Sequence, residues 1–285
     1  MELSKHPSDT TPRADIASKS VTTDKLSRLP HFRPACMKLM TLSIHSNTAI
    51  GEFVAVFEAD PALASDLLLM ANSAEFGASS QIETVRHALT FLGLERVRSL
   101  ASTIAFHLSL GDADPDTVRP LWAHGIATAI IADELGEKCG RPGLYTTGLV
   151  HDMGRLGLLR AIGADYSAIL LGRFASVDEA TRLERQLCGM DHCEAGAYLA
   201  DKWRFPVALQ ASMAAHHSIG LVSEPRQLVR SACEIADAMG YPEVERDDVG
   251  SAEELCGAVH LLPDVLRDHI EKRIVSLVGQ KLPVQ

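Results

Sequence analysis

Histidine is the residue type whose distribution in this sequence points most directly to chemistry. The chain contains 12 histidines, and five of them fall between residues 117 and 243: His124, His151, His192, His216 and His217. Four of these five have apolar neighbours at helical spacing. A single histidine on an apolar face is most often a hydrogen-bonded core residue. Several in one region can instead share a metal ion or an anion, because each neutral imidazole keeps one donor and one acceptor that need partners.

The sharpest local pattern is the dipeptide His151-Asp152. Adjacent residues of a helix point about 100° apart, so these two side chains can share a ligand only if other helices complete its coordination. Asp237 is a candidate for that contribution, because it is an acidic residue within an apolar predicted helix. A buried carboxylate is costly unless it is paired, hydrogen-bonded or coordinated. The sequence therefore predicts an inward-facing polar cluster of His124, His151, Asp152 and Asp237.

The elements that must position this cluster are helices. From Leu29 onward apolar residues recur at helical spacing, and no convincing alternating strand pattern is present. Asp60-Pro61 predicts a helix start and Gly93 a helix end. In the second half of the chain, helices are predicted over residues 121–135, 143–159, 191–203, 206–217, 225–239, 252–262 and 265–278. The fold class is therefore all-α.

The chain divides into four segments at changes of composition. Residues 1–28 contain eleven Ser, Thr or Pro residues without a periodic pattern, which predicts a mobile tail that is dispensable for folding. Residues 29–110 form a predicted N-terminal lobe, and the polar run 111–116 separates it from a C-terminal lobe over residues 117–243. Residues 244–285 form a predicted C-terminal helical extension.

Composition excludes several classes of protein. The 285 residues carry a formal net charge of −10, which argues against a basic nucleic-acid or membrane-surface binder. Aromatic residues make up 5%, too few for a stacking platform on single strands. No apolar run approaches the length of a spanning helix, and the first residues lack a secretory signal. The six cysteines form no CxxC pair, so we expect free thiols in a cytoplasmic protein.

The order of these residues is similar to that of the HD superfamily of metal-dependent phosphohydrolases, and more closely to its HDOD subfamily. The order His124, His151-Asp152, His192, His216-His217 and Asp237 carries the first resemblance. Segments 60–63, 71–77, 88–98 and 148–155 carry the second, together with Glu184, residues 192–206 and His216-His217. These segments span roughly three quarters of the chain, and they are specific together although each alone is weak.

The resemblance implies two packed helical lobes, the C-terminal one HD-domain-like, in a bacterial signal-transduction protein. It implies that His124, His151, Asp152 and Asp237 match the metal-holding positions of HD hydrolases. His192, His216 and His217 match positions that supply further ligands in the cyclic di-GMP phosphodiesterase branch. That branch has Lys where this chain has Arg155, and it has a Gly-Tyr-Pro signature that is absent after His217. Recognition of a substrate in the manner of the cyclic di-GMP phosphodiesterases is therefore not expected, although the ligand set is present.

Three hypotheses for function follow. The first is a regulatory module that binds a signalling protein or small ligand, with a nucleotide second messenger among the candidates. The second is a metal-dependent phosphohydrolase acting on a nucleotide or cyclic dinucleotide, in which Asp152 would bridge metals or orient water and Arg155 would contact phosphate. The third, a DNA-binding regulator using Arg86, Arg96 and Arg98, is disfavoured by the net charge. Any metal would be divalent iron, manganese, zinc or nickel, because histidine and aspartate suit all four.

Overall fold

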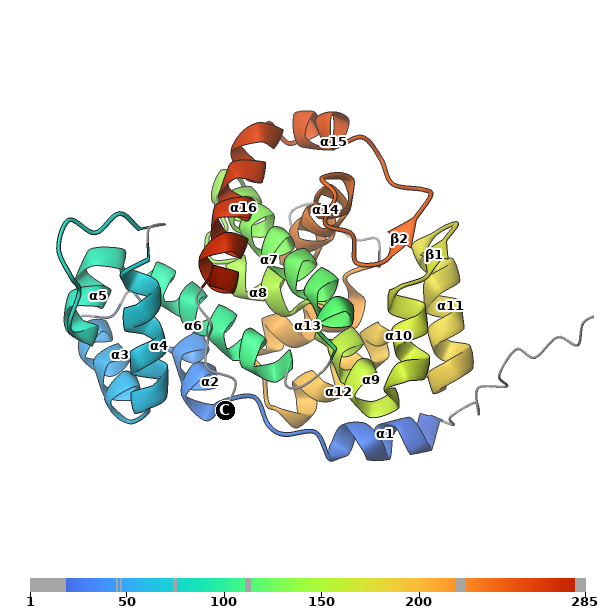
Figure 1. Ribbon diagram of the computed structural model, residues 1–285, viewed down its shortest axis with the longest axis horizontal. Helices are drawn as coiled ribbons and strands as arrows, with labels where there is room; N and C mark the ends of the chain where they lie inside the picture. The colour runs from blue at the N-terminus through green and yellow to red at the C-terminus, as the bar shows by residue number, and fades with distance from the viewer. Residues whose placement is uncertain are drawn as a thin grey trace, which may run out of the picture.

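The computed structural model describes residues 19–44, 46, 48–73, 76–110, 114–218 and 224–279, with side chains except those of residues 107–110 and 273–279. The described chain is almost entirely helical, as the sequence predicts, and its helices form two packed lobes (Figure 1). None of the helices within these residues is long and apolar enough to cross a membrane.

The N-terminal lobe is formed by five successive helices. They are α2 (Pro34–Thr41), α3 (Ala49–Glu58), α4 (Pro61–Ala71), α5 (Val85–Leu92) and α6 (Leu94–Leu110). The predicted start of α4 is confirmed, because the Asp60 carboxylate accepts a hydrogen bond of 3.0 Å from Leu63 N and Pro61 occupies the first helical turn. Gly93 ends α5 with a φ of +81°, as predicted.

The C-terminal lobe contains the helices that position the predicted cluster. They are α7 (Pro115–Lys138), α8 (Tyr145–Val150), α9 (Met153–Ile162), α10 (Ala164–Leu170), α11 (Val177–Cys188), α12 (His192–Lys202), α13 (Val207–Ala215) and α14 (Pro225–Ala238). Two further helices, α15 (Ala252–Ala258) and α16 (Pro263–Gly279), make up the C-terminal extension, and α16 packs against α7.

The two lobes are joined by buried hydrogen bonds between α6 and α8. Ser102 Oγ lies 2.9 Å from Thr146 Oγ1, and Thr103 Oγ1 lies 2.9 Å from the Tyr145 hydroxyl. Because each hydroxyl satisfies its partner, these polar groups are buried between apolar helices without an unpaired donor or acceptor. The N-terminal lobe is thereby fixed to the helix that leads directly into His151.

The predicted helix over residues 143–159 is wrong in one respect that matters for the site. The chain leaves the helical conformation at Asp152, which has φ −104° and ψ 18°, so His151 and Asp152 lie between α8 and α9. The helices on either side of the break are closely packed. A Cβ atom on Gly154 would lie 1.8 Å from the His192 carbonyl oxygen, and one on Gly148 would lie 2.8 Å from Ala129 Cα. Glycine therefore lets α9 approach α12 and α8 approach α7.

The all-α prediction is confirmed, although the described chain also contains two very short strands. Arg173–Phe174 (β1) and Glu245–Arg246 (β2) form a short parallel pair, extended by a hydrogen bond from Asp247 N to Phe174 O of 3.0 Å. Two residues per strand are too few to produce an alternating pattern in the sequence. The pair attaches the segment after α14 to the rest of the C-terminal lobe.

Part of the predicted tail is an ordered helix. Lys19–Ser27 forms α1, which packs on α9 and α12 (Figure 1). Leu26 is fully buried, and Thr22 Oγ1 donates a 2.6 Å hydrogen bond to Cys188 O. The Lys202 ammonium donates to the Ser27 and Leu29 carbonyl oxygens at 2.5 and 2.9 Å, which caps the end of α1. The sequence pattern missed this helix because few of its residues are buried; residues 1–18 lie outside the described part of the chain.

Truncation of Leu26 tests whether α1 belongs to the folded unit. We expect Leu26→Ala to lower the free energy of unfolding by about 2–5 kcal/mol, because it leaves a cavity against α9 and α12. Val21→Ala, which truncates an exposed residue of the same helix, is expected to cost less than about 1 kcal/mol. Urea denaturation of the two variants measures this difference. Equal stabilities for Leu26→Ala and wild type would show that α1 does not pack on the body in solution.

Asp133 on α7 gives a prediction about pH. Burial raises the pKa of Asp133 to about 6, and the nearby charges of Glu95 and Glu137 add to the shift. The folded state therefore holds a proton that the unfolded state has lost, so stability falls as pH rises from about 4 to about 6. Asp133→Asn should remove this decrease and raise the thermal midpoint at pH 7, measured by thermal denaturation across this range. Asp116→Asn, which neutralises an exposed carboxylate of the same helix, should keep the wild-type slope.

Candidate metal centre

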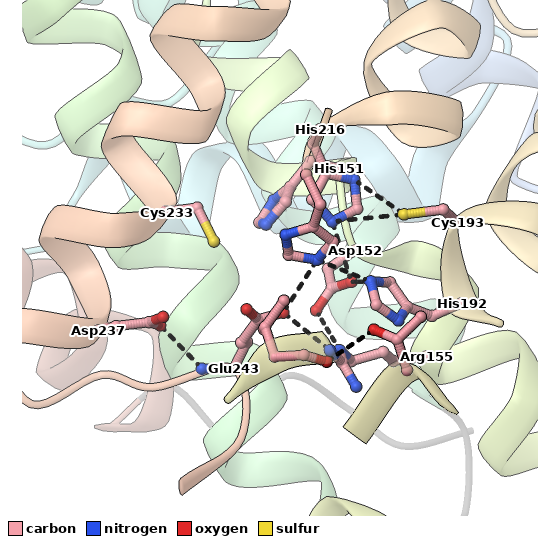
Figure 2. A network of polar contacts seen from close by, with 12 residues as sticks. His151, Asp152, Arg155, His192, Cys193, His216, Cys233, Asp237 and Glu243 are labelled. Carbon is pink, nitrogen blue, oxygen red and sulfur yellow. Dashed lines mark hydrogen bonds and ion pairs between the residues drawn. The ribbon is translucent and has the colours of Figure 1, made fainter. Parts of the chain in front are cut away.

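The structure brings all of the predicted site residues into one buried region of the C-terminal lobe (Figure 2). Their side chains come from α7, the α8–α9 junction, the start of α12, the end of α13 and α14. At most 1% of His124, His151, His192 and His216 is exposed, whereas the side chain of His217 is 24% exposed. The region is therefore an interior cluster with His217 at its solvent edge.

Three of the histidines are oriented in the same way. In each, Nδ1 lies within 2.8 Å of a fixed oxygen: Tyr241 O for His124, Gly148 O for His151 and Glu184 Oε2 for His192. Their Nε2 atoms face into the cluster, where those of His124 and His151 lie 3.2 Å apart. Metal-ligating histidines commonly have this arrangement, because an Nδ1–H held by an oxygen leaves the Nε2 lone pair free for the ion.

Asp152 contributes an oxygen that has no hydrogen-bond partner among the described residues. Its Oδ2 accepts a 2.8 Å hydrogen bond from Arg155 Nε, but Oδ1 is buried and unsatisfied. Oδ1 lies 3.6 Å from His192 Nε2 and 3.7 Å from His216 Nε2. An unpaired buried carboxylate oxygen is costly, and a divalent cation held together with the two imidazoles would satisfy it. The residues present therefore fit a metal ion at this point.

Arg155 connects three carboxylates at the base of the cluster. Its side chain is fully buried, and it donates to Asp152, to Glu184 Oε1 at 2.6 Å and to Glu243 Oε2 at 2.8 Å. Glu184 also accepts from the Tyr166 hydroxyl and from His192. Each of the three guanidinium nitrogens thus donates to a carboxylate of the cluster, and the side chain is fully buried rather than presented to a substrate phosphate.

Asp237 occupies a different position from the one that the sequence suggested. Its Oδ2 accepts a 2.6 Å hydrogen bond from Arg246 Nη2, and its Oδ1 accepts one of 3.0 Å from Glu243 N. Oδ1 also lies 3.4 Å from His124 Nδ1, on the side of the ring that faces away from His151. Asp237 forms a donor group with Cys233 and Glu243, and no donor group among the described residues contains all four predicted ligands.

Instead, donor atoms within the described residues converge in overlapping groups. Asp152, His192, His216 and Glu243 form one group, and His124, His151 and Cys233 form another, each with ligand atoms within 4.8 Å of one another. Sequence reasoning missed Glu243, Cys193 and Cys233. Glu243 follows α14 in a loop without any periodic signal, and the cysteines have no paired spacing. Glu184 was part of the family resemblance without an assigned role, although its position on the buried face of α11 is a detectable signal.

Burial and neighbouring charges shift the pKa values of four of the imidazoles in different directions. Burial lowers the pKa of His151 to about 4 and, together with the neighbouring imidazoles, lowers that of His216 well below its usual range. Burial also acts to lower the pKa of His124, but the hydrogen bond and charge of Asp237 outweigh it and raise the pKa to about 9. The charge of Glu184 similarly raises the pKa of His192 above its usual range, despite burial and Arg155. Binding of a metal at His192 would therefore release a proton.

An acidic cavity leads to the edge of the cluster. It has a volume of about 490 Å³ and reaches His217, Cys233 and Glu243. Its outer wall carries the carboxylates of Asp178, Glu234 and Asp248 and the guanidiniums of Arg230 and Arg246. Arg230 is paired with Glu234 at 2.9 Å, and Arg246 is paired with Asp237 and Asp248. The entrance therefore offers a cation a more favourable environment than it offers a phosphate dianion.

The fold and the site together define a class: an all-helical, two-lobed domain with an interior cluster of histidines and carboxylates. The HDOD domain model matches residues 29–219, and the chain belongs to the HDOD domain family.

Solved structures agree in fold. An HDOD domain protein of unknown function from Geobacter sulfurreducens is 22% identical, with a TM-score of 0.69 over 94% of this chain and 98% of that one. A Shewanella amazonensis protein proposed to be a phosphohydrolase is 21% identical, with a TM-score of 0.66 over 93% of this chain and 98% of that one. A Marinobacter aquaeolei protein proposed to act in signal transduction is 19% identical, with a TM-score of 0.67 over 93% of this chain and 66% of that one.

A curated relative is an uncharacterized protein from Treponema pallidum, 23% identical over 205 residues. The match covers 69% of this chain but only 39% of that relative.

Replacement of Arg155 tests its role in holding the cluster. Arg155→Met leaves three adjacent buried carboxylates without their shared cation, so we expect a loss of stability of about 3–5 kcal/mol. Arg160→Met removes an exposed arginine from the same helix and should change stability by less than about 0.5 kcal/mol. Chemical denaturation at neutral pH compares the two. Wild-type stability in Arg155→Met would mean that the carboxylates do not depend on this guanidinium.

Proposed function

We propose that this HDOD domain is a signal-transduction module in which the interior cluster binds a divalent metal without hydrolysing a phosphate ester. Asp152, His192 and His216 would hold the ion, with His151 and Glu243 beside them. The observation that carries the proposal is the position of Arg155. This arginine, which follows His151-Asp152 in the sequence and was the candidate for phosphate recognition, is buried and paired with three carboxylates instead.

The cavity supports the same proposal. Its carboxylates outnumber its guanidiniums, and both guanidiniums are engaged in ion pairs. A nucleotide or cyclic dinucleotide would have to bring two or more negative charges into this environment, which Coulomb repulsion opposes. We therefore favour a partner protein or a small ligand bound elsewhere on the domain, whose binding is communicated through the packed helices.

Nucleic acid is a weaker proposal. Arg98, on the hairpin that α5 and α6 form, donates to both Glu95 carboxylate oxygens at 2.6 Å, and the Arg96 guanidinium lies 5.6 Å from the centre of the Phe76 ring. These contacts leave no extended basic stripe along the hairpin to follow a phosphate backbone.

A second candidate function, metal-dependent phosphohydrolysis, is favoured by the donor set itself. Imidazole and carboxylate ligands around one ion can lower the pKa of a bound water enough to make it a nucleophile at neutral pH. Relatives in the solved structures are proposed to be phosphohydrolases, one of them metal-dependent. The experiment must therefore measure metal binding and turnover on the same preparations.

The test compares wild type with His151→Ala/Asp152→Ala, each without metal and with Mn²⁺, Fe²⁺ or Zn²⁺. A metal that binds only the folded wild type should add about 2.7 kcal/mol of stability at 100 times its Kd, and the double variant should lose this gain. Elemental analysis and thermal denaturation measure binding. Hydrolysis of bis-p-nitrophenyl phosphate and of a cyclic dinucleotide measures turnover, which we expect to be absent.

His87→Ala, which removes an exposed histidine of the N-terminal lobe, serves as a control and should respond to metal as wild type does. Metal-dependent hydrolysis that disappears in the double variant would replace the regulatory proposal with the enzymatic one. Equal thermal midpoints with and without metal in the wild type would instead identify the cluster as a metal-free hydrogen-bonded core.

A further inference from the structure

A thiol lies beside each of the two groups of imidazoles. Cys193 Sγ lies 3.8 Å from His216 Nδ1 and 4.0 Å from its Nε2, and Cys233 Sγ lies 3.6 Å from His124 Nε2. Figure 2 shows the two sulfur atoms on opposite sides of the cluster, Cys193 from α12 and Cys233 from α14. The cysteines were expected to be ordinary free thiols, so this placement is information that only the fold provides.

The donor atoms around Cys193 lie close enough together to hold one tetrahedral ion. Ligand atoms of His192, Cys193, His216 and His217 all lie within 4.8 Å of one another. With metal–nitrogen bonds of about 2.0–2.1 Å and a metal–sulfur bond of about 2.3 Å, two nitrogens lie about 3.3 Å apart and a nitrogen and a sulfur about 3.6 Å apart. The observed separations are 2.9 Å between His192 Nε2 and His217 Nε2 and 3.8 Å between the sulfur and His216. Side-chain adjustments of a few tenths of an ångström would match them.

Two further features distinguish this group from a chance cluster. The buried Asp152 Oδ1, which has no hydrogen-bond partner within the described chain, lies close to the His192 and His216 nitrogens of the same group. Cys193 is also partly exposed, on the first turn of α12, so an ion can reach its thiol from solvent. Cys233 lacks this advantage, because it lies within α14 and burial raises the pKa of its thiol.

We infer that Cys193 is a metal ligand, and that with His192, His216 and His217 it forms a thiolate–imidazole site selective for zinc over manganese or magnesium. A thiolate donor favours Zn²⁺ and other soft or borderline ions, whereas Mn²⁺ and Mg²⁺ prefer oxygen ligands. This inference rests on the proposed metal binding, and it explains why such an ion would be held without being offered to a phosphate substrate. In this set Cys193 and His217 take the place that Asp152 has in the proposed function, and the Asp152 carboxylate would lie beside the ion as a counter-charge. Four protein ligands leave a tetrahedral ion without an open position.

Cobalt substitution tests the inference directly. The reduced, metal-free full-length protein is titrated with Co²⁺, which reports its ligands by absorption: d–d bands in the visible, and a thiolate-to-cobalt charge-transfer band in the near ultraviolet. We expect both in wild type and in Cys139→Ser, whose thiol is exposed at the end of α7. Cys193→Ser should lose the charge-transfer band, and its zinc affinity should fall by more than about 10-fold. Zn²⁺ should displace Co²⁺, whereas equimolar Mn²⁺ should not.

Alkylation of the wild-type protein provides a measurement that does not depend on whether the variant folds. Iodoacetamide labelling followed by peptide mass spectrometry reads each cysteine separately. Zn²⁺ should slow the labelling of Cys193 several-fold and leave that of Cys139 unchanged in the same sample. Unchanged labelling of Cys193 at saturating Zn²⁺ would overturn the inference.

The outcomes separate this inference from the proposed function. Visible cobalt bands without a thiolate band would show that carboxylates, not Cys193, complete the site, and would overturn the inference while metal binding stands. A thiolate band that survives in Cys193→Ser but not in Cys233→Ser would overturn it in favour of the His124 group. The absence of any cobalt spectrum would overturn metal binding itself. Phosphodiester hydrolysis would overturn only the regulatory proposal.

Discussion

The guanidinium of Arg155 holds together segments of the chain that are far apart in sequence. It donates to Asp152 at the start of α9, to Glu184 on α11 and to Glu243 after α14. Each carboxylate in turn lies against one or more histidines. Glu184 accepts hydrogen bonds from the backbone N–H and the Nδ1 of His192. Glu243 lies 3.4 Å from His217 Nε2, and the Asp152 carboxylate faces His192 and His216. The three carboxylates that face His192, His216 and His217 are therefore held by one buried cation, which is costly to bury unless its N–H groups find acceptors.

Charge balance explains why so many ionisable groups can occupy one interior. The four carboxylates of Asp152, Glu184, Asp237 and Glu243 face the guanidiniums of Arg155 and Arg246, and the raised pKa values of His124 and His192 supply two imidazoliums. The cluster is thus close to neutral without a metal. A divalent ion that displaced the His192 proton and the Cys193 thiol proton would leave this balance unchanged, so metal and protons are alternatives for the same positions.

The helices around the cluster pack closely against one another and bury its side chains. Gly148 and Gly154 bring α8 and α9 against α7 and α12, and α1 covers the outer side of α9 and α12. What reaches solvent is an acidic cavity at His217 and Glu243. An enzyme that hydrolyses phosphate esters needs an open coordination position and a route for an anion. The proposed regulatory role needs neither, because it uses the coupling of neighbouring helices through groups that must all be satisfied together.

The sequence by itself determined the helical class, the start of a helix at Asp60-Pro61 and the grouping of five histidines in one lobe, because these depend on local periodicity and capping. The family resemblance added Glu184 without a role. Only the tertiary structure decided that α8 and α9 separate at His151-Asp152, that residues 19–27 pack as a helix, and that Asp237 pairs with Arg246 while Glu243 joins the cluster. It alone placed Cys193 and Cys233 beside imidazoles. The physical reason is that the position of each side chain in the cluster is fixed by contacts between distant segments. The Tyr241 carbonyl that orients His124, for example, lies 117 residues further along the chain. No local sequence pattern records which segments meet.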